Sequence, residues 1–363
     1  LLLLLLLTAC ATRPPETAET RTTYPHGAVS LFDLEKKPVL ASPGIGKRSH
    51  VNILALSGGG SDGAFGVGVL KGWSESGKRP EFDIVTGVST GALIASLAFL
   101  GPAYDEVLEE AYTETRNRDV FRSKGLSGIF GASLYDYAPF KKTIEELITQ
   151  EVLDAIAREH RKGRRLYVAT TNLDAGNLVV WDIGDIASSD FPMRLRVVHK
   201  ILRASAAVPA FFKPVYIQPT ADSEARQMHV DGGVKAPVLI RSFMFNTPAR
   251  HTSLYVIVNG QIRLMNAEQA VEPGVVDISR KAISELVRGL LHESVYRGYV
   301  IARNAGADFH LISVPDELPA TEDALEFDPG TMRGLFAIGR ELGRSGKGWR
   351  KEPPRLDALS RIR

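Results

Sequence analysis

The sequence predicts an α/β fold built on a mainly parallel sheet with helices packed on it. Two consecutive segments, 51–73 and 82–100, share one pattern: an apolar β-rich run, a glycine-containing turn and a helix-like run. Successive strand–turn–helix units place their strands in parallel, with both turns at the carboxyl edge of the sheet. Because ligands bind at that edge in open α/β sheets, we expect the functional site at these two turns.

The second turn, Gly87-Val88-Ser89-Thr90-Gly91, places a serine between two glycines. It lies between a predicted strand at 82–86 and a helix that runs through Leu100. A G-x-S-x-G corner between strand and helix exposes the serine hydroxyl, and its glycines avoid clashes with the neighbouring backbone. The amino end of the helix also favours negative charge at the serine. We therefore predict that Ser89 is a nucleophile. The alternative is a structural serine in an ordinary turn.

The first turn contains three successive glycines, Gly58, Gly59 and Gly60, between a predicted strand at 51–56 and a helix from Gly63 to Trp73. The spacing also matches the G-x-G-x-x-G dinucleotide fingerprint, which requires an acidic residue at the end of the next strand. That strand ends here in Thr86-Gly87. We favour an oxyanion hole, because glycine amides can approach a reacting carbonyl closely.

A serine nucleophile needs a base. Asp231 closes a predicted strand and is followed by two glycines that allow a tight turn. Burial near the nucleophile's helix would raise its pKa and its basicity. Two alternatives remain open: a simple Asp-Gly turn, and a histidine-dependent esterase that uses His310 or His229. No histidine follows a strand in a glycine-marked loop; the eight are His26, His50, His160, His199, His229, His251, His292 and His310.

Together these motifs resemble the patatin-like phospholipase family. The family carries a glycine-rich oxyanion loop, a G-x-S-x-G elbow and a D-G-A/G aspartate in this order. Here they correspond to Gly58–Gly63, Gly87–Gly91 and Asp231–Gly233. The block Ala204–Pro209, with Phe212, is similar to the family's A-S-x-x-x-P segment. The resemblance covers residues 51–240.

The resemblance implies a three-layer sandwich, in which helices flank a mainly parallel central sheet. It also implies a serine acyl hydrolase that cleaves carboxylic esters of lipids without a histidine, a metal or a cofactor. Ser89 would be the nucleophile and Asp231 the base, and the amides of Gly58, Gly59 and Gly60 would hold the oxyanion. The remaining motif positions support the turns: Gly63, Gly87, Gly91, Gly232 and Gly233.

One position departs from the family pattern. Asp62 stands in the glycine loop where the family often has Arg or Lys. A carboxylate there opposes a developing oxyanion unless it points away or is paired. Asp62 and the basic segment 344–363 motivate a rival hypothesis, in which the protein is a catalytically idle lipoprotein that binds lipid or an envelope partner on the same scaffold.

The first residues suggest a membrane-anchored protein. Leu1–Leu7 is too short an apolar run to span a bilayer and is typical of a signal-peptide core. Leu7-Thr8-Ala9-Cys10 resembles the bacterial lipobox, which implies cleavage before Cys10 and a lipid on its sulfur. Since Cys10 is the only cysteine, it forms no internal disulfide. Ala11 after the cysteine suits outer-membrane sorting, so we expect a bacterial cell-envelope protein on the periplasmic face.

We expect a truncated signal peptide at 1–9, a lipidated tether at 10–50, a catalytic domain at 51–343 and a frayed basic tail at 344–363. The net charge of +2 gives no indication of a nucleic-acid partner. The apolar, glycine-containing segment 122–137 is a candidate lid or an ordinary connection. Further predicted helices are 104–121, 140–161, 193–205, 275–304 and 331–342. Further predicted strands are 29–34, 165–171, 178–183, 213–217, 228–230, 253–258 and 308–314.

Overall fold

The computed structural model describes residues 29–30, 45, 48–125, 132–218, 226–247, 249–262, 270–318 and 323–354. The predicted signal peptide, Cys10, most of the tether and residues 355–363 lie outside the described residues. None of the described helices has both the length and the apolar character needed to cross a membrane.

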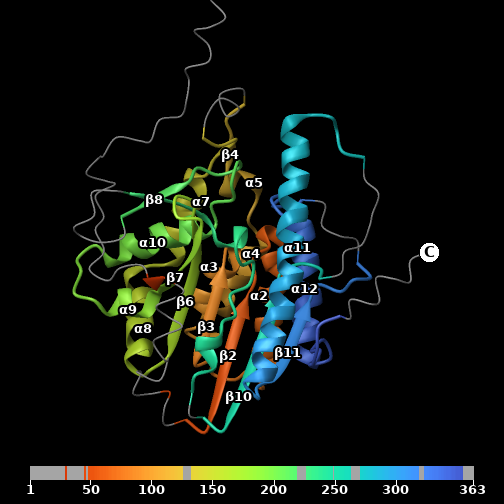
Figure 1. The fold of residues 1–363 in the computed structure, drawn as a ribbon. Helices are drawn as coiled ribbons and strands as arrows, with labels where there is room; N and C mark the ends of the chain where they lie inside the picture. The colour runs from red at the N-terminus through yellow and green to blue at the C-terminus, as the bar shows by residue number, and fades with distance from the viewer. Residues whose placement is uncertain are drawn as a thin grey trace, which may run out of the picture.

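The main sheet has nine described strands, which lie in one layer (Figure 1). Along its path the order is β1-β7-β6-β3-β2-β10-β11, and β9 joins β6 and β8 beside that path. The five strands from β6 to β11 on this path run parallel, whereas β1, β7, β8 and β9 pair antiparallel. Their bounds are β1 Val29–Ser30, β2 His50–Leu56, β3 Ile84–Val88, β6 Arg165–Asn172, β7 Asn177–Asp182, β8 Val215–Ile217, β9 Gln227–Asp231, β10 His251–Val258 and β11 Asp308–Ser313.

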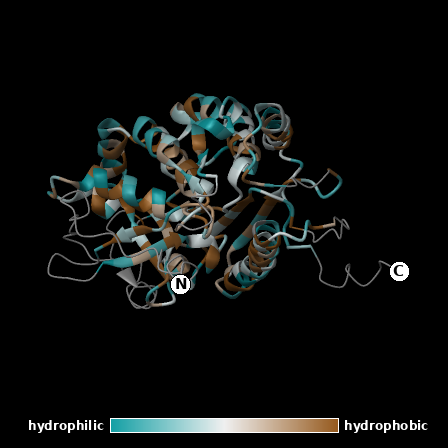
Figure 2. Ribbon diagram, turned by 90° about the horizontal axis from the view of Figure 1, so that it is seen from above, coloured by the Kyte–Doolittle hydropathy of each residue, from teal (hydrophilic) through white to brown (hydrophobic). Residues whose placement is uncertain are grey.

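Helices cover both faces of this sheet. One face packs on α2, α3, α8, α10 and α12, and the other packs on α11 and the segment 236–245. Alternate side chains of β2 enter the two cores. Leu54 and Leu56 belong to the first core, and Ile53 and Ala55 belong to the second. In Figure 2 the central strands are mostly brown and much of the teal lies on the surrounding helices. The predicted three-layer α/β sandwich is confirmed. The longer helices are α2 Gly63–Glu75, α3 Thr90–Ala98, α4 Asp105–Thr113, α7 Ala138–Leu147, α8 Gln150–Arg161, α10 Arg194–Ser205, α11 Val275–Asn304 and α12 Pro329–Ser345.

Two segments predicted as single helices are each broken in two. The segment 104–121 forms α4 and the short α5 (Asn117–Val120), because the Asp119 carboxylate accepts a hydrogen bond from the extended Arg116 amide at 3.0 Å. The segment 140–161 forms α7 and α8, because Thr149 caps the second helix by accepting from Val152 N–H at 3.4 Å. Side-chain caps thus override an apolar periodicity that continues across both breaks.

The predicted boundary at residue 344 is wrong. Helix α12 extends to Ser345, and the chain then returns to the sheet. The Trp349 ring lies 4.9 Å from that of Trp73, and the Arg350 and Leu311 backbones exchange hydrogen bonds of 2.8 Å. The residues up to 354 therefore belong to the domain, because an indole and a backbone bridge hold them there.

Helices α2 and α12 lie side by side at backbone contact distance (Figure 1). A Cβ at Gly72 would lie 1.9 Å from the Arg340 carbonyl oxygen, and one at Gly343 would lie 2.2 Å from that of Val69. Only glycine allows this approach. Because α2 begins directly after the glycine turn, its packing on α12 helps to fix that turn in place.

We expect Gly343→Ala to lower the free energy of unfolding by about 1–3 kcal/mol, because the new methyl group must push two helices apart. Gly334→Ala is the matched control on the same helix, since a Cβ there meets nothing within 4 Å. It should be neutral or stabilising by up to about 1 kcal/mol. Urea unfolding of both variants measures the difference, and equal effects would contradict this account of the helix contact.

Candidate active site

Ser89 forms the corner between β3 and α3. Strand β3 continues through Val88 and α3 begins at Thr90, so the corner is shorter than the predicted turn. The backbone of Ser89 has φ 55° and ψ −129°, a conformation that costs a residue with a side chain about 1–3 kcal/mol. Such strain is typical of a nucleophile held out of a sheet. The structure therefore places Ser89 where the motif predicts.

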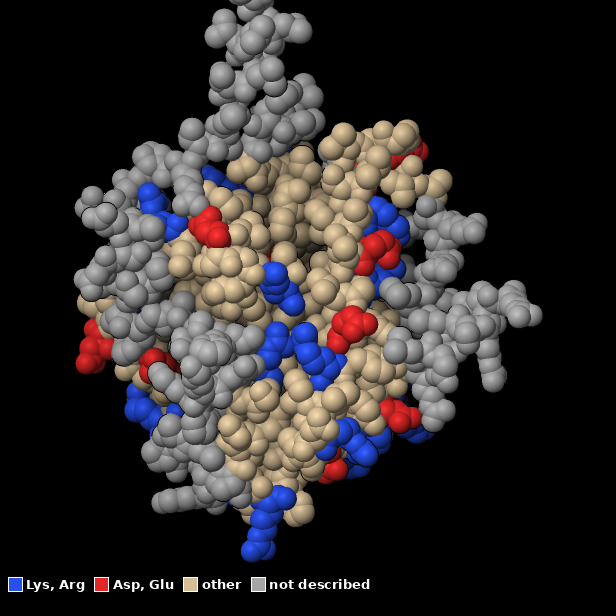
Figure 3. All heavy atoms as spheres, viewed as in Figure 1, with Lys and Arg blue, Asp and Glu red and all other residues tan. Residues whose placement is uncertain are grey.

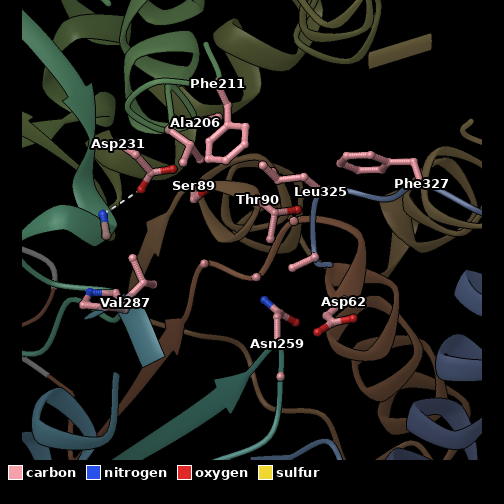
Figure 4. A pocket seen from close by; sticks show the side chains of 18 of the residues that line it. Asp62, Ser89, Thr90, Ala206, Phe211, Asp231, Asn259, Val287, Leu325 and Phe327 are labelled. Carbon is pink, nitrogen blue, oxygen red and sulfur yellow. Dashed lines mark hydrogen bonds between the residues drawn. The ribbon is translucent and has the colours of Figure 1, made fainter. Parts of the chain in front are cut away.

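Asp231, the last residue of β9, lies beside Ser89 (Figure 4). Its carboxylate is 5% exposed and accepts a hydrogen bond from the Gly233 amide at 2.7 Å. Burial raises the pKa of Asp231 to about 6, and hydrogen bonds from the Ser89 side chain and the Gly233 amide offset this only in part. A carboxylate with this pKa is a far better base than a solvated aspartate and is still ionised at neutral pH.

The carboxyl end of α10 and the residues just after it hold both Ser89 and Asp231. The buried Ser205 hydroxyl accepts the Ser89 amide proton at 2.9 Å and donates to the Ala169 carbonyl at 2.8 Å. Two residues later, the Ala207 carbonyl accepts the Asp231 amide proton at 2.9 Å. Ser205 is thus a positioning residue that sequence reasoning did not single out. The sequence did indicate the block Ala204–Pro209, through its resemblance to a family segment, but it did not indicate what Ser205 does there.

The glycine turn lies against the nucleophile, since a Cβ at Gly58 would be 3.1 Å from the Ser89 Cβ. The Gly58 amide, however, donates to the Pro237 carbonyl at 2.9 Å. The prediction that the Gly58 amide is part of the oxyanion hole is therefore wrong, because this amide already has an acceptor. No described residue accepts a hydrogen bond from the amides of Gly59 or Gly60, which leaves these two as the candidate donors.

A cavity of about 270 Å³ opens at Ser89, Asp231 and the glycine turn. Its wall is largely apolar and also contains polar side chains, among them Asp62, Asn259 and Gln261. The apolar side chains come from distant parts of the chain and include Leu93, Phe140, Leu147, Phe211, Phe212, Val287 and Phe327. This arrangement suits a substrate with a long apolar chain next to a polar group.

Asp62 lies on the far side of the cavity from Asp231 in Figure 4, with Ser89 on the Asp231 side. It is 7% exposed and stands at the amino end of α2, next to Asn259 in the cavity wall. Its carboxylate therefore does not lie beside Ser89 and Asp231. The amino end of a helix is a favourable place for a negative charge.

None of the described histidines lines the cavity. The His229 ring lies 2.9 Å from the Thr170 hydroxyl, and burial lowers its pKa to about 4, so that it is neutral. His310 stacks on Tyr255 at 4.6 Å, on the far strands of the sheet. The histidine-dependent alternative therefore finds no support in this geometry.

Comparisons with known proteins agree with the motifs. A profile of the family described as patatin-like phospholipase matches residues 54–244. A cGAMP-activated phospholipase of Escherichia coli (strain TW11681) is 26% identical over 203 residues, 52% of this chain and 53% of the relative. A cUMP-AMP-activated phospholipase of Escherichia coli is 42% identical over 72 residues, 19% of this chain and 22% of the relative. The chain thus matches about half of the first relative's length and less of the second's.

Solved structures with weak overall similarity include two bacterial proteins. VipD from Legionella pneumophila has a TM-score of 0.45 and 12% identity, covering 83% of this chain and 68% of that chain. A chain of the SpcU–ExoU complex from Pseudomonas aeruginosa has a TM-score of 0.32 and 13% identity, covering 82% and 52%.

We expect Asp231→Asn to be more stable than the wild type at pH 7, by up to about 3 kcal/mol. The raised pKa means that ionising Asp231 costs folding free energy, whereas an amide stays neutral and still accepts from Gly233. The wild type loses this stability as the pH rises from about 4 through about 6. The gain of the variant should therefore vanish below about pH 4. Urea unfolding at several pH values measures it, and a variant that is less stable at pH 7 contradicts the buried-base account.

We expect Ser205→Ala to lower kcat at least tenfold with little change in KM, because the strained Ser89 corner loses the side-chain hydrogen bond to its amide. The variant should also lose about 1–3 kcal/mol of stability, since two buried backbone groups lose their partner. Ser96→Ala is the control: Ser96 is equally buried on α3, but its hydroxyl only adds a bond to the Ala92 carbonyl. Equal kinetic effects in the two variants would refute the positioning role.

Proposed function

Because the chain belongs to the patatin-like phospholipase family, we propose that it is a serine acyl hydrolase that cleaves carboxylic esters of lipids with a Ser89–Asp231 dyad. The observation that carries the proposal is the buried Asp231 carboxylate, which lies beside Ser89 in the lining of a largely apolar cavity. The open amides of Gly59 and Gly60 next to this pair complete an arrangement suited to acyl transfer.

In this mechanism Ser89 Oγ attacks the ester carbonyl while Asp231 takes the hydroxyl proton. The amides of Gly59 and Gly60 stabilise the oxyanion, and each such donor contributes about 3 kcal/mol in the transition state. Asp231 then gives its proton to the leaving alcohol, which yields an acyl-enzyme. A water molecule, deprotonated by Asp231, hydrolyses the acyl-enzyme and restores Ser89.

The cavity supports a lipid as the substrate class. Three aromatic side chains of the cavity wall belong to one aromatic group. The rings of Phe212 and Phe327 lie 6.0 Å and 6.4 Å from that of Phe121, between centroids, and the ring of Phe211 lies 6.2 Å from that of Tyr135. This wall suits an acyl chain, and the polar side chains of Asn259 and Gln261 in the same cavity suit the polar part of a lipid.

The direct test is hydrolysis of long-chain p-nitrophenyl esters and phospholipid in mixed micelles by the full chain. We expect wild-type turnover and a loss of at least about 10³-fold in Ser89→Ala and Asp231→Asn, because each removes half of a catalytic unit. Circular dichroism checks that the variants are folded. Intact activity in Ser89→Ala sinks the proposal, and a folded but inert wild type favours the idle binding protein.

We further propose that the protein is anchored in the bacterial cell envelope by a lipid on Cys10, on the periplasmic face of the outer membrane. The support is the Leu7-Thr8-Ala9-Cys10 sequence alone. With the complete leader in place, Cys10→Ala should abolish incorporation of labelled palmitate and shift the protein from the membrane to the soluble fraction. Labelling that persists in this variant contradicts the anchor.

A further inference from the structure

The amino-terminal half of α11 projects from the body of the protein at the top of Figure 1. No described side chain between residues 275 and 290 is buried. Several of its large apolar side chains are exposed instead: Val275 (83%), Ile278 (53%), Leu286 (67%) and Leu290 (37%). In Figure 3 the surface of this projecting end is mainly tan, with few charged atoms.

These four side chains share one side of the helix. At 100° per residue they fall within an arc of about 120°. We call this set, Val275, Ile278, Leu286 and Leu290, the outer face. Further along the same side the helix carries the exposed charged residues Glu293 and Arg297. Glu293 and Arg297 thus separate the outer face from Val300, which is exposed further along the same side.

The same half of α11 forms part of the catalytic cavity on its other side. Ile283, Val287 and Leu291 line the cavity that contains Ser89. Since a helix with its side chains is about 10–12 Å across, the outer face lies about one helix diameter from the wall of the catalytic cavity. Whatever the outer face contacts is thereby held close to this wall of the cavity.

One arginine ties this half of α11 to other parts of the chain near the cavity. Arg280 Nη2 donates to the Tyr135 hydroxyl at 3.1 Å, and Nη1 lies 3.5 Å from an Asp323 carboxylate oxygen. The guanidinium also lies 5.7 Å from the centre of the Phe211 ring. These contacts join α11 to the segment 132–137, part of the predicted lid at 122–137; residues 126–131 lie outside the described range.

We infer that the outer face of α11 docks on the surface of a phospholipid membrane and delivers its lipids to the Ser89 cavity. The inference rests on the proposed function, because the other side of this half of α11 lines a cavity proposed to receive an acyl chain. Burying exposed apolar side chains supplies the attraction. A lipid surface is favoured over a protein partner because the same half of the helix lines, on its other side, the cavity proposed to receive an acyl chain.

The test uses the full chain carrying Cys10→Ala, so that no covalent lipid masks weaker binding. Ile278→Gln with Leu286→Gln removes two members of the outer face and keeps helix-forming residues. Val300→Gln is the matched control, since Val300 is 51% exposed on the same helix but lies beyond the charged residues. Co-sedimentation with vesicles of phosphatidylcholine and one-fifth phosphatidylglycerol measures binding.

We expect the double variant to bind vesicles at least about tenfold more weakly and to hydrolyse vesicle lipid correspondingly more slowly. Its hydrolysis of a short, monomeric ester should equal that of the wild type, and Val300→Gln should match the wild type in every assay. Unchanged vesicle binding in the double variant overturns the inference. A dimer that the double variant dissociates, with vesicle binding retained, also overturns it by assigning the face to a second copy.

The outcomes also separate this inference from the proposed function. A wild type that binds vesicles through the outer face but hydrolyses neither ester nor phospholipid supports the docking surface and contradicts the catalytic proposal. A wild type that hydrolyses both but binds vesicles equally well without the outer face contradicts only the docking surface.

Discussion

The site depends on one constraint: the Asp231 carboxylate is kept out of water, and none of the groups that shift its pKa is a cation. Asp231 has a raised pKa because burial disfavours its ionised form, and only the Ser89 side chain and the Gly233 amide oppose that effect. The same desolvation that destabilises the folded protein at neutral pH gives an aspartate the proton affinity that a base needs. The usual role of a histidine is thus available to a carboxylate through burial alone.

A second cost falls on the neighbouring residue, because Ser89 adopts a backbone conformation that side chains disfavour. Several segments hold it there: β3 and α3 flank it in sequence, Ser205 accepts its amide proton, and the glycine turn lies against it. The strained Ser89 and the desolvated Asp231 therefore lie together at one edge of the sheet. The two hydrophobic cores and the close α2–α12 contact provide the stability that offsets both costs.

The sequence was sufficient to predict the features that are local in the chain. The corner at Ser89, the aspartate at the end of a strand and the 30 residues of α11 follow from glycine spacing and apolar periodicity. The use of the Gly58 amide was predicted wrongly, because its acceptor, Pro237, is brought close only by the fold. Ser205 was overlooked for the same reason. The outer face of α11 could not be predicted from the sequence, because only the structure shows which side of the helix stays exposed.

The central claim is that Asp231 activates Ser89, and the pH dependence of covalent labelling tests it most directly. A fluorophosphonate probe reports the reactivity of the serine without requiring turnover of a lipid. The account predicts that the wild-type labelling rate rises with pH, with a midpoint near 6, as Asp231 loses its proton. It also predicts that Asp231→Asn labels far more slowly and without this midpoint. A variant that labels at the wild-type rate with the same pH profile would contradict the account.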